Sequence, residues 1–229
     1  MIGVTENLRK IRDLLAKAAV DAGRSAETVQ LLAVSKKQPL SSIIEAAAAG
    51  QRDFGENQVA EGIDKIATLG DNKLVWHFIG HLQTNKTRAV AEHFDWVHSV
   101  DRLKTARRLS DQRPASLPQL NVCIQVNVDN EPGKSGVAAD TTLDIAREIL
   151  ELPRLRLRGL MCLPAIRHDF EGQREPFRQL RRLADQLGAN GISTDTLSMG
   201  MSADFRAAIF EGSTMVRLGT AIFGARTEQ

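Results

Sequence analysis

The stretch LLAVSKKQP (residues 31–39) joins a short apolar run to two adjacent lysines, and a helical pattern follows it over residues 40–49. A short apolar run that ends in polar residues is typical of a buried strand. A strand followed by an amphipathic helix is the repeating unit of a parallel sheet. Lys36 and Lys37 stand where this strand ends, so each is either a solvated cap or an amine at the mouth of a pocket.

Seven more apolar runs continue the same alternation along the chain. The predicted strands cover residues 31–35, 52–56, 75–80, 95–100, 122–128, 156–163, 196–200 and 215–224. Helical patterns between them cover residues 40–49, 58–67, 84–92, 102–110, 141–150, 175–187 and 202–209. Eight strands with interleaved helices in 229 residues predict a (β/α)8 barrel of the TIM type. The alternative is an open doubly wound sheet, which usually has fewer strands.

The whole chain is expected to form one domain, residues 1–229, in which residues 1–24 add an N-terminal helix packed on the barrel. With 42% hydrophobic and 25% charged residues, the chain has enough apolar material for a sizeable core. The formal net charge of +2 is too small to predict a nucleic-acid partner. Because the N-terminus lacks a signal-like apolar segment and no run could span a membrane, we expect a cytoplasmic protein.

Two glycine-rich segments follow the last two predicted strands. They are SMGMS (residues 198–202) and RLGTAIFG (residues 217–224). In barrels of this type the active site lies at the carboxyl ends of the strands, and the loops after the last two strands frequently bind phosphate. The segments therefore predict a phosphate site. The alternative is that Gly200 and Gly219 only make tight turns and that Ser202 only caps a helix starting near residue 202.

Two cationic residues stand out on these strands. Arg217 lies inside an apolar run, where a guanidinium needs hydrogen-bond acceptors. Its partner is either a carboxylate elsewhere in the core or a ligand atom in the barrel mouth. Lys36 could have its pKa lowered by burial and by nearby cations, which would leave a neutral amine that can form a Schiff base with a carbonyl.

The motifs AVSKKQP, FGENQVAE, WHFIGHLQTNK, KSGV, LRGLMCLP, LSMGMSADFRAAI and VRLGTAIFG occur in this order. Together they resemble the pyridoxal phosphate homeostasis protein family, the single-barrel relatives of the alanine racemase N-terminal domain. The resemblance runs from about residue 29 to residue 226. It implies pyridoxal phosphate fold type III without the C-terminal β domain.

The resemblance also implies roles for individual residues. Lys36 would hold pyridoxal 5'-phosphate as a Schiff base, and Arg217 would face the pyridine nitrogen. The remaining cofactor-binding residues that the resemblance implies are Asn57, Met199, Ser202, Gly219 and Thr220. The chain would act in intracellular homeostasis of the cofactor by carrying it or releasing it to pyridoxal phosphate-dependent acceptor enzymes.

The alternative function is a pyridoxal phosphate-dependent amino-acid racemase or lyase that uses Lys36 as its base. A permanently protonated Arg217 would make the pyridine ring a weaker electron sink, which restrains carbanion chemistry. The chain contains no tyrosine, although racemases of the related fold use one from a second domain as their second base. We therefore expect little catalytic turnover and, without the second domain, a monomer.

Other candidate motifs give weaker signals. His77 and His81 are four residues apart but lack the glutamate of a zinc-binding helix motif, so no metal site is expected. His81 could instead form a hydrogen bond at the pocket mouth, and His77 is expected in the core. Lys134 is interpreted as a basic residue at the barrel mouth and, with Lys37 and Lys86, as a candidate secondary amine. A basic interaction module without a cofactor is the third functional alternative.

Overall fold

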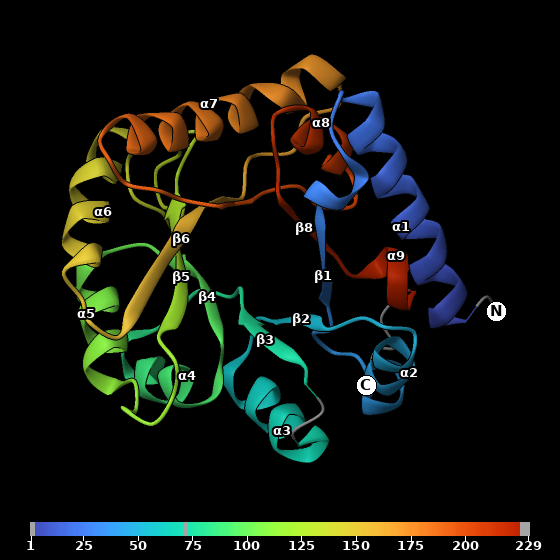
Figure 1. Cartoon of the computed structure of the whole chain (residues 1–229), viewed down its shortest axis with the longest axis horizontal. Coiled ribbons are helices and arrows are strands. Elements are labelled where there is room, and N and C mark those ends of the chain that lie inside the picture. The colour runs from blue at the N-terminus through green and yellow to red at the C-terminus, as the bar shows by residue number, and fades with distance from the viewer. Residues whose placement is uncertain (1–2, 71–72, 225–229) are drawn as a thin grey trace.

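The computed structural model describes residues 3–70 and 73–224. These residues form a closed barrel of parallel strands in the order β1 to β8, with the α-helices outside it (Figure 1). The strands are β1 Gln30–Val34, β2 Asp53–Glu56, β3 Val75–Phe78, β4 Trp96–Val100, β5 Leu120–Val126, β6 Leu155–Cys162, β7 Thr196–Ser198 and β8 Met215–Leu218. Pairing of β1 with β8, in which Leu32 lies opposite Arg217, closes the barrel. The prediction of a (β/α)8 barrel is confirmed, and the open-sheet alternative is wrong.

The helices follow the strands as the alternation predicts. They are α1 Val4–Asp21, α2 Leu40–Ala48, α3 Val59–Leu69, α4 Thr87–His93, α5 Leu103–Gln112, α6 Thr142–Leu150, α7 Phe170–Ala189, α8 Phe205–Phe210 and α9 Thr220–Phe223. Short 3-10 helices lie at Ala26–Thr28, Thr84–Lys86 and Ala139–Thr141. Within the described ranges, none of the helices combines the length and the apolar character that a membrane span requires.

The additional N-terminal helix packs on the outside of the barrel, as predicted. Leu8, Ile11 and Leu15 of α1 are buried at helical spacing, and α1 lies against α2, α8 and α9 (Figure 1). The Asn7 side chain donates to the carbonyl of Ile222 in α9 at 2.9 Å. The first helix therefore covers the seam where the last strand meets the first.

Two predicted element boundaries near the end of the chain are corrected by the structure. The eighth strand ends at Leu218, and the apolar residues after it form the short helix α9, in which Ile222 is buried. The helix expected from residue 202 begins only at Phe205. The carboxylate of Asp204 accepts from the backbone N–H of Met201 at 2.6 Å, so residues 201–204 form a turn in place of the first helical turn.

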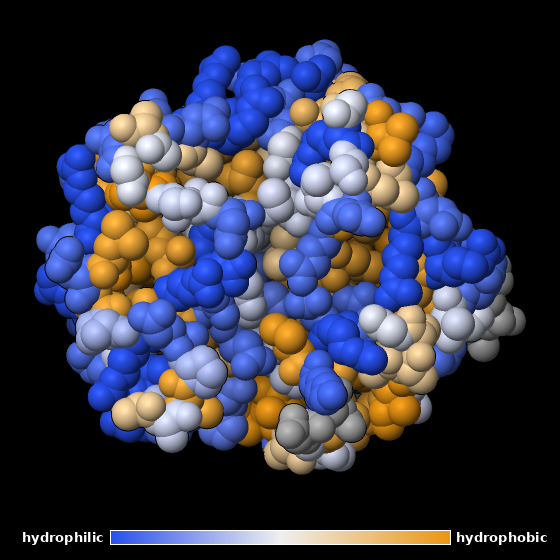
Figure 2. Space-filling model, viewed as in Figure 1, coloured by the Kyte–Doolittle hydropathy of each residue, from blue (hydrophilic) through white to orange (hydrophobic). Residues whose placement is uncertain are grey.

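The apolar core fills the space between the barrel and its helices. Its largest fully buried side chains include Phe54, Phe78, Phe94 and Phe177. Both cysteines, Cys123 and Cys162, are buried and unpaired, and burial raises the pKa of each thiol to about 12. The outer surface in Figure 2 is mostly hydrophilic, with separate apolar patches. Several polar or charged side chains are also buried, among them Ser35, Glu56 and Arg217, which lie at or next to strand ends.

Candidate functional site

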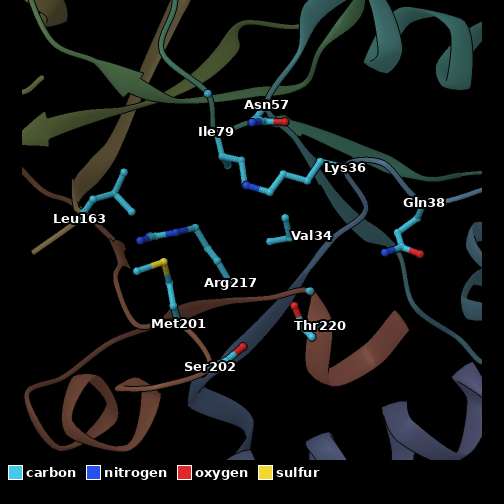
Figure 3. A pocket seen from close by; sticks show the side chains of 12 residues that line it. Val34, Lys36, Gln38, Asn57, Ile79, Leu163, Met201, Ser202, Arg217 and Thr220 are labelled. Carbon is cyan, nitrogen blue, oxygen red and sulfur yellow. The ribbon is translucent and has the colours of Figure 1, made fainter. Parts of the chain in front are cut away.

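A cavity of about 360 Å³ lies at the carboxyl ends of the strands (Figure 3). Six of the seven residues predicted to bind a cofactor line it: Lys36, Asn57, Ser202, Arg217, Gly219 and Thr220. The other lining residues are Val34, Gln38, Ile79, Gly80, Leu163 and Met201. The wall therefore combines two cationic side chains, two hydroxyls and several apolar groups drawn from six strand ends.

Lys36 and Lys37 have different environments. Lys36 is half-buried and its side chain extends into the cavity with its amine beside Ile79 (Figure 3). Lys37 is exposed and has a φ of 58°, in the left-handed region that non-glycine residues rarely adopt. Both lysines lie in the turn after β1, which ends at Val34. Of the two, Lys36 lines the cavity and Lys37 is exposed to solvent.

The backbone just before Lys36 is held by a buried ammonium group. Lys65 on α3 donates from Nζ to the carbonyl of Ser35 at 2.7 Å and to Oε1 of Glu56 at 2.8 Å. The hydroxyl of Ser35 also donates to Oε1 of Glu56, at 2.6 Å. Burial raises the pKa of Glu56, while Lys65 and Ser35 act in the opposite direction. This buried ion pair fixes the residue that precedes Lys36.

A second carboxylate holds the backbone just after Lys36. Oε1 of Glu61 accepts from the backbone N–H of Lys37 at 2.5 Å and from Nζ of Lys65 at 2.7 Å. This role of α3 is not among the predictions made from the sequence. The sequence does contain a signal for it. Lys65 is three residues after Gly62 and four before Leu69, which places it on the helix face that the structure shows to be buried.

Arg217 is buried at the wall of the cavity. Its guanidinium donates to the carbonyl of Ser198 at 2.5 Å, to the hydroxyl of Ser198 at 2.8 Å and to the carbonyl of Cys162 at 2.8 Å. None of these partners among the described residues is a carboxylate, so the alternative in which a core carboxylate is the partner of Arg217 is wrong. Burial lowers the pKa of Arg217 from its usual value. Neutral oxygens thus hold a cation whose end lies at the cavity (Figure 3).

The opposite end of the cavity carries hydroxyl groups. Ser202, in the loop after β7, and Thr220, the first residue of α9, are exposed and direct their hydroxyls toward each other (Figure 3). Ser202 does not cap α8, whose N-cap is Asp204. Gly200 has a φ of 99°, in the left-handed region that favours glycine. Gly219 lies so close to β1 that an added Cβ would be 3.0 Å from the carbonyl oxygen of Val34.

Asn57 and Met199 differ in position. Asn57 lines the cavity, and its backbone is packed so tightly on Gly80 that a Cβ at Gly80 would lie 2.2 Å from its carbonyl oxygen. Met199 is fully buried and is not among the lining residues, whereas Met201 is. A contact between Met199 and a cofactor therefore gains no support from its placement. Met201 was not predicted, although it follows a strand end like the other site residues.

The remaining candidates lie away from the cavity lining. Nδ1 of His81 lies 3.1 Å from the hydroxyl of Ser135, and Lys134 pairs with Glu131 at 2.5 Å. His77 is fully buried, as expected. Within the described residues, no cluster of histidine, cysteine and acidic side chains could hold a metal ion. The cavity itself offers an amine, a guanidinium and hydroxyls, which suit a small anionic ligand with an electrophilic carbonyl.

Known proteins resemble this chain over nearly its whole length. Residues 5–227 match the family model described as alanine racemase, N-terminal domain. The pyridoxal phosphate homeostasis protein of Escherichia coli strain K12 is 54% identical over 229 residues, which cover 99% of this chain and 98% of that protein. The structure of PipY from Synechococcus elongatus PCC7942 with pyridoxal phosphate bound has a TM-score of 0.84 at 37% identity, covering 96% of this chain and 100% of that one.

A more distant structural relative shares only the fold. Alanine racemase from Corynebacterium glutamicum has a TM-score of 0.73 at 16% identity. The match covers 98% of this chain but 61% of the racemase.

Proposed function

This chain belongs to the alanine racemase N-terminal domain family and, within it, to the pyridoxal phosphate homeostasis proteins, and from this membership we propose that it binds pyridoxal 5'-phosphate in the cavity at Lys36. The observation that carries the proposal is the cavity that Lys36 shares with Arg217. The PipY structure with the cofactor bound supports it at 37% identity over nearly the whole chain.

The residues of the cavity fit the chemical groups of this cofactor. When bound, pyridoxal phosphate supplies an aldehyde that condenses with a primary amine to a Schiff base with loss of water, a pyridine nitrogen and a phosphate. Lys36 offers the amine, and the Arg217 guanidinium offers N–H donors for the ring nitrogen. Ser202 and Thr220 offer hydroxyl donors, and Gly219 allows a close approach to the backbone. Asn57 is proposed as a further contact.

We propose that the protein holds and releases the cofactor and does not turn over amino acids efficiently. Arg217 keeps its proton because the pKa of a guanidinium lies far above neutral, so it cannot protonate the ring as a carboxylic acid could. The chain contains no tyrosine that could act as the second base of a racemase. The racemase alternative rests on likeness in fold alone, because the racemase is 16% identical.

We propose that the protein releases the cofactor to pyridoxal phosphate-dependent acceptor enzymes. We also propose that it acts as a single domain and as a monomer in the cytoplasm. A closed barrel supports the monomer, since it leaves no open strand edge for pairing between copies. Two buried, unpaired cysteines are consistent with a reducing compartment.

Trapping of the bound cofactor tests the assignment of Lys36. The purified protein is titrated with pyridoxal phosphate, reduced with borohydride and digested, and the modified peptide is identified by mass spectrometry. We expect the adduct on Lys36, its loss in Lys36→Ala, and its retention in the matched control Lys37→Ala. A protein that takes up no cofactor, or an adduct that persists at full yield in Lys36→Ala, would refute the proposal.

Isotope exchange separates the carrier from the racemase or lyase. Loaded protein is incubated in heavy water with a panel of amino acids, and deuterium at the α-carbon is followed by NMR. A carrier gives no sustained exchange. Sustained exchange that disappears in Lys36→Ala would favour the enzyme.

A further inference from the structure

A line of hydrogen bonds runs inside the barrel from Arg217 to the amino end of β2. It passes from Nη1 of Arg217 to Oγ of Ser198 (2.8 Å), to Nδ1 of His98 (2.8 Å), from Nε2 of His98 to Nδ1 of His77 (2.9 Å), and from Nε2 of His77 to Oδ1 of Asp53 (3.1 Å). Ser198 and both histidines are fully buried. The line thus connects the cavity wall with the far end of the barrel through four hydrogen bonds.

The chemistry of the two ends fixes the direction in which these bonds donate. A guanidinium can only donate, and an ionised carboxylate can only accept. Ser198 accepts from Arg217 and is left with its own proton for Nδ1 of His98. His98 then carries its proton on Nε2 and donates it to Nδ1 of His77, which in turn donates from Nε2 to Asp53. Every donor and acceptor along the line is satisfied in this arrangement.

The opposite direction fails at both ends. If His77 donated from Nδ1, its bare Nε2 would face the carboxylate of Asp53, and two acceptors would lie 3.1 Å apart. His98 would then donate to a Ser198 hydroxyl that already accepts from Arg217, which leaves the serine proton without its partner in the line. A buried polar group that is left without a hydrogen-bond partner lowers the stability of the folded protein. The arrangement that leaves none of these groups unpaired therefore has both imidazoles neutral and protonated on Nε2.

The surroundings of His98 support this neutral form. Burial lowers the pKa of His98 well below its ordinary value, and the Arg217 cation acts in the same direction. His77 is stacked on Trp96, with ring centroids 5.2 Å apart and an angle of 16° between the planes. The imidazoles are thus held in place as well as in tautomer.

We propose that Asp53, His77 and His98 are positioning residues that hold the Ser198 hydroxyl as an acceptor for Arg217 and so fix the guanidinium at the cavity wall. That the guanidinium there meets the pyridine nitrogen rests on the proposed function. Asp53 is 17% exposed and also lines a second cavity of about 420 Å³ between α1 and the amino end of the barrel. The line therefore joins a partly solvent-accessible carboxylate to the cofactor cavity.

Nitrogen NMR of the protein without cofactor tests the line independently of cofactor binding. Long-range ¹H–¹⁵N spectra distinguish the two neutral imidazole tautomers, and His77→Gln and His98→Gln assign the signals. We expect both His77 and His98 as the Nε2–H form, with slowly exchanging N–H protons. A charged imidazolium or an Nδ1–H tautomer at either residue would overturn the proposal.

A substitution at the outer end then tests the effect on Arg217. Asp53→Leu removes the final acceptor, whereas Asp53→Asn keeps an oxygen that can accept from His77; Asp144→Leu, at a side chain that is 79% exposed, is the matched surface control. In Asp53→Leu we expect a mixed tautomer at His98, a shifted absorption band of the loaded protein and cofactor binding that is about 2- to 10-fold weaker. Asp53→Asn should restore the band in large part.

The outcomes separate this inference from the proposed function. If His98 changes tautomer in Asp53→Leu while absorption and affinity stay at the wild-type values, the positioning of Arg217 is refuted, although the cofactor still binds at Lys36. If wild-type protein takes up no cofactor, the proposed function fails, and the tautomers still decide whether the line exists.

Discussion

Replacement of Lys65 by methionine tests how the loop that carries Lys36 is held. The substitution keeps most of the side-chain volume and removes the ammonium group. Glu56, which is fully buried, would lose its cationic partner, and the carbonyl of Ser35 would lose a donor. Loss of one partner from a buried ion pair costs about 3–5 kcal/mol. We expect the free energy of unfolding to fall by an amount in this range at neutral pH.

Urea denaturation followed by circular dichroism measures this change. Lys17→Met is the matched control, because Lys17 pairs with Asp21 on the surface of α1 and its side chain is 68% exposed. Exposed pairs of this kind contribute about 0–1 kcal/mol. The double variant Lys65→Met with Glu56→Gln removes both charges and should recover a large part of the loss.

The pH dependence gives a further check with a defined sign. A raised pKa in the folded state means that folding favours the protonated acid, so the contribution of Glu56 to stability is greatest below its unfolded pKa of about 4.3 and falls as pH rises through the folded value. Without Lys65 the pKa rises further, and protonation limits the loss. The destabilisation by Lys65→Met should therefore be smaller at about pH 5 than at about pH 7.5. A loss below about 1 kcal/mol at neutral pH, or a double variant no more stable than the single one, would refute the reasoning.

Two other substitutions give separate tests. Burial by itself raises the pKa of Asp129, but hydrogen bonds, including one from Arg167 at 2.6 Å, lower this pKa overall. The ionised Asp129 therefore stabilises the folded protein above its unfolded pKa of about 3.9, and this contribution is lost as pH falls through the folded value. Asp129→Asn should cost about 1.5–3 kcal/mol at neutral pH and flatten the loss of stability between about pH 4 and pH 2, measured by thermal unfolding; an unchanged acid profile would contradict this. Gly200→Ala should cost about 1–3 kcal/mol, because φ is 99° and the new Cβ would lie 2.7 Å from Cβ of Ala208. Gly188→Ala is its control, since a Cβ there meets nothing within 4 Å, and equal denaturation midpoints for the two variants would count against the strain at residue 200.

Much of the architecture could be predicted from local sequence. Most strands appeared as apolar runs because both faces of a barrel strand are covered, and the count of eight predicted strands favoured the closed barrel. The end of the last strand was misplaced because α9 is as apolar as the strand before it, so composition alone did not separate them. The start of α8 was misplaced because Ser202 has the residue type of a helix cap, whereas Asp204 makes the turn.

The cavity was predictable for a similar reason. Carboxyl ends of parallel strands meet at one end of a barrel, so polar residues that follow the runs come together whatever the loops do. Six of the seven predicted residues line the cavity on that ground. Met199 does not, because its side chain is fully buried in the apolar core.

The sequence by itself thus determined the barrel, the family and the lysine at the end of the first strand, because these follow from short-range patterns and motifs. Only the tertiary structure decided which buried polar groups pair. Lys65 meets the carbonyl of Ser35 from 30 residues away, and Ser198 meets His98 from 100 residues away. A periodic pattern can mark one partner as buried, as it does for Lys65, but it does not show which group that partner meets. Barrel closure brings the two partners within hydrogen-bond distance.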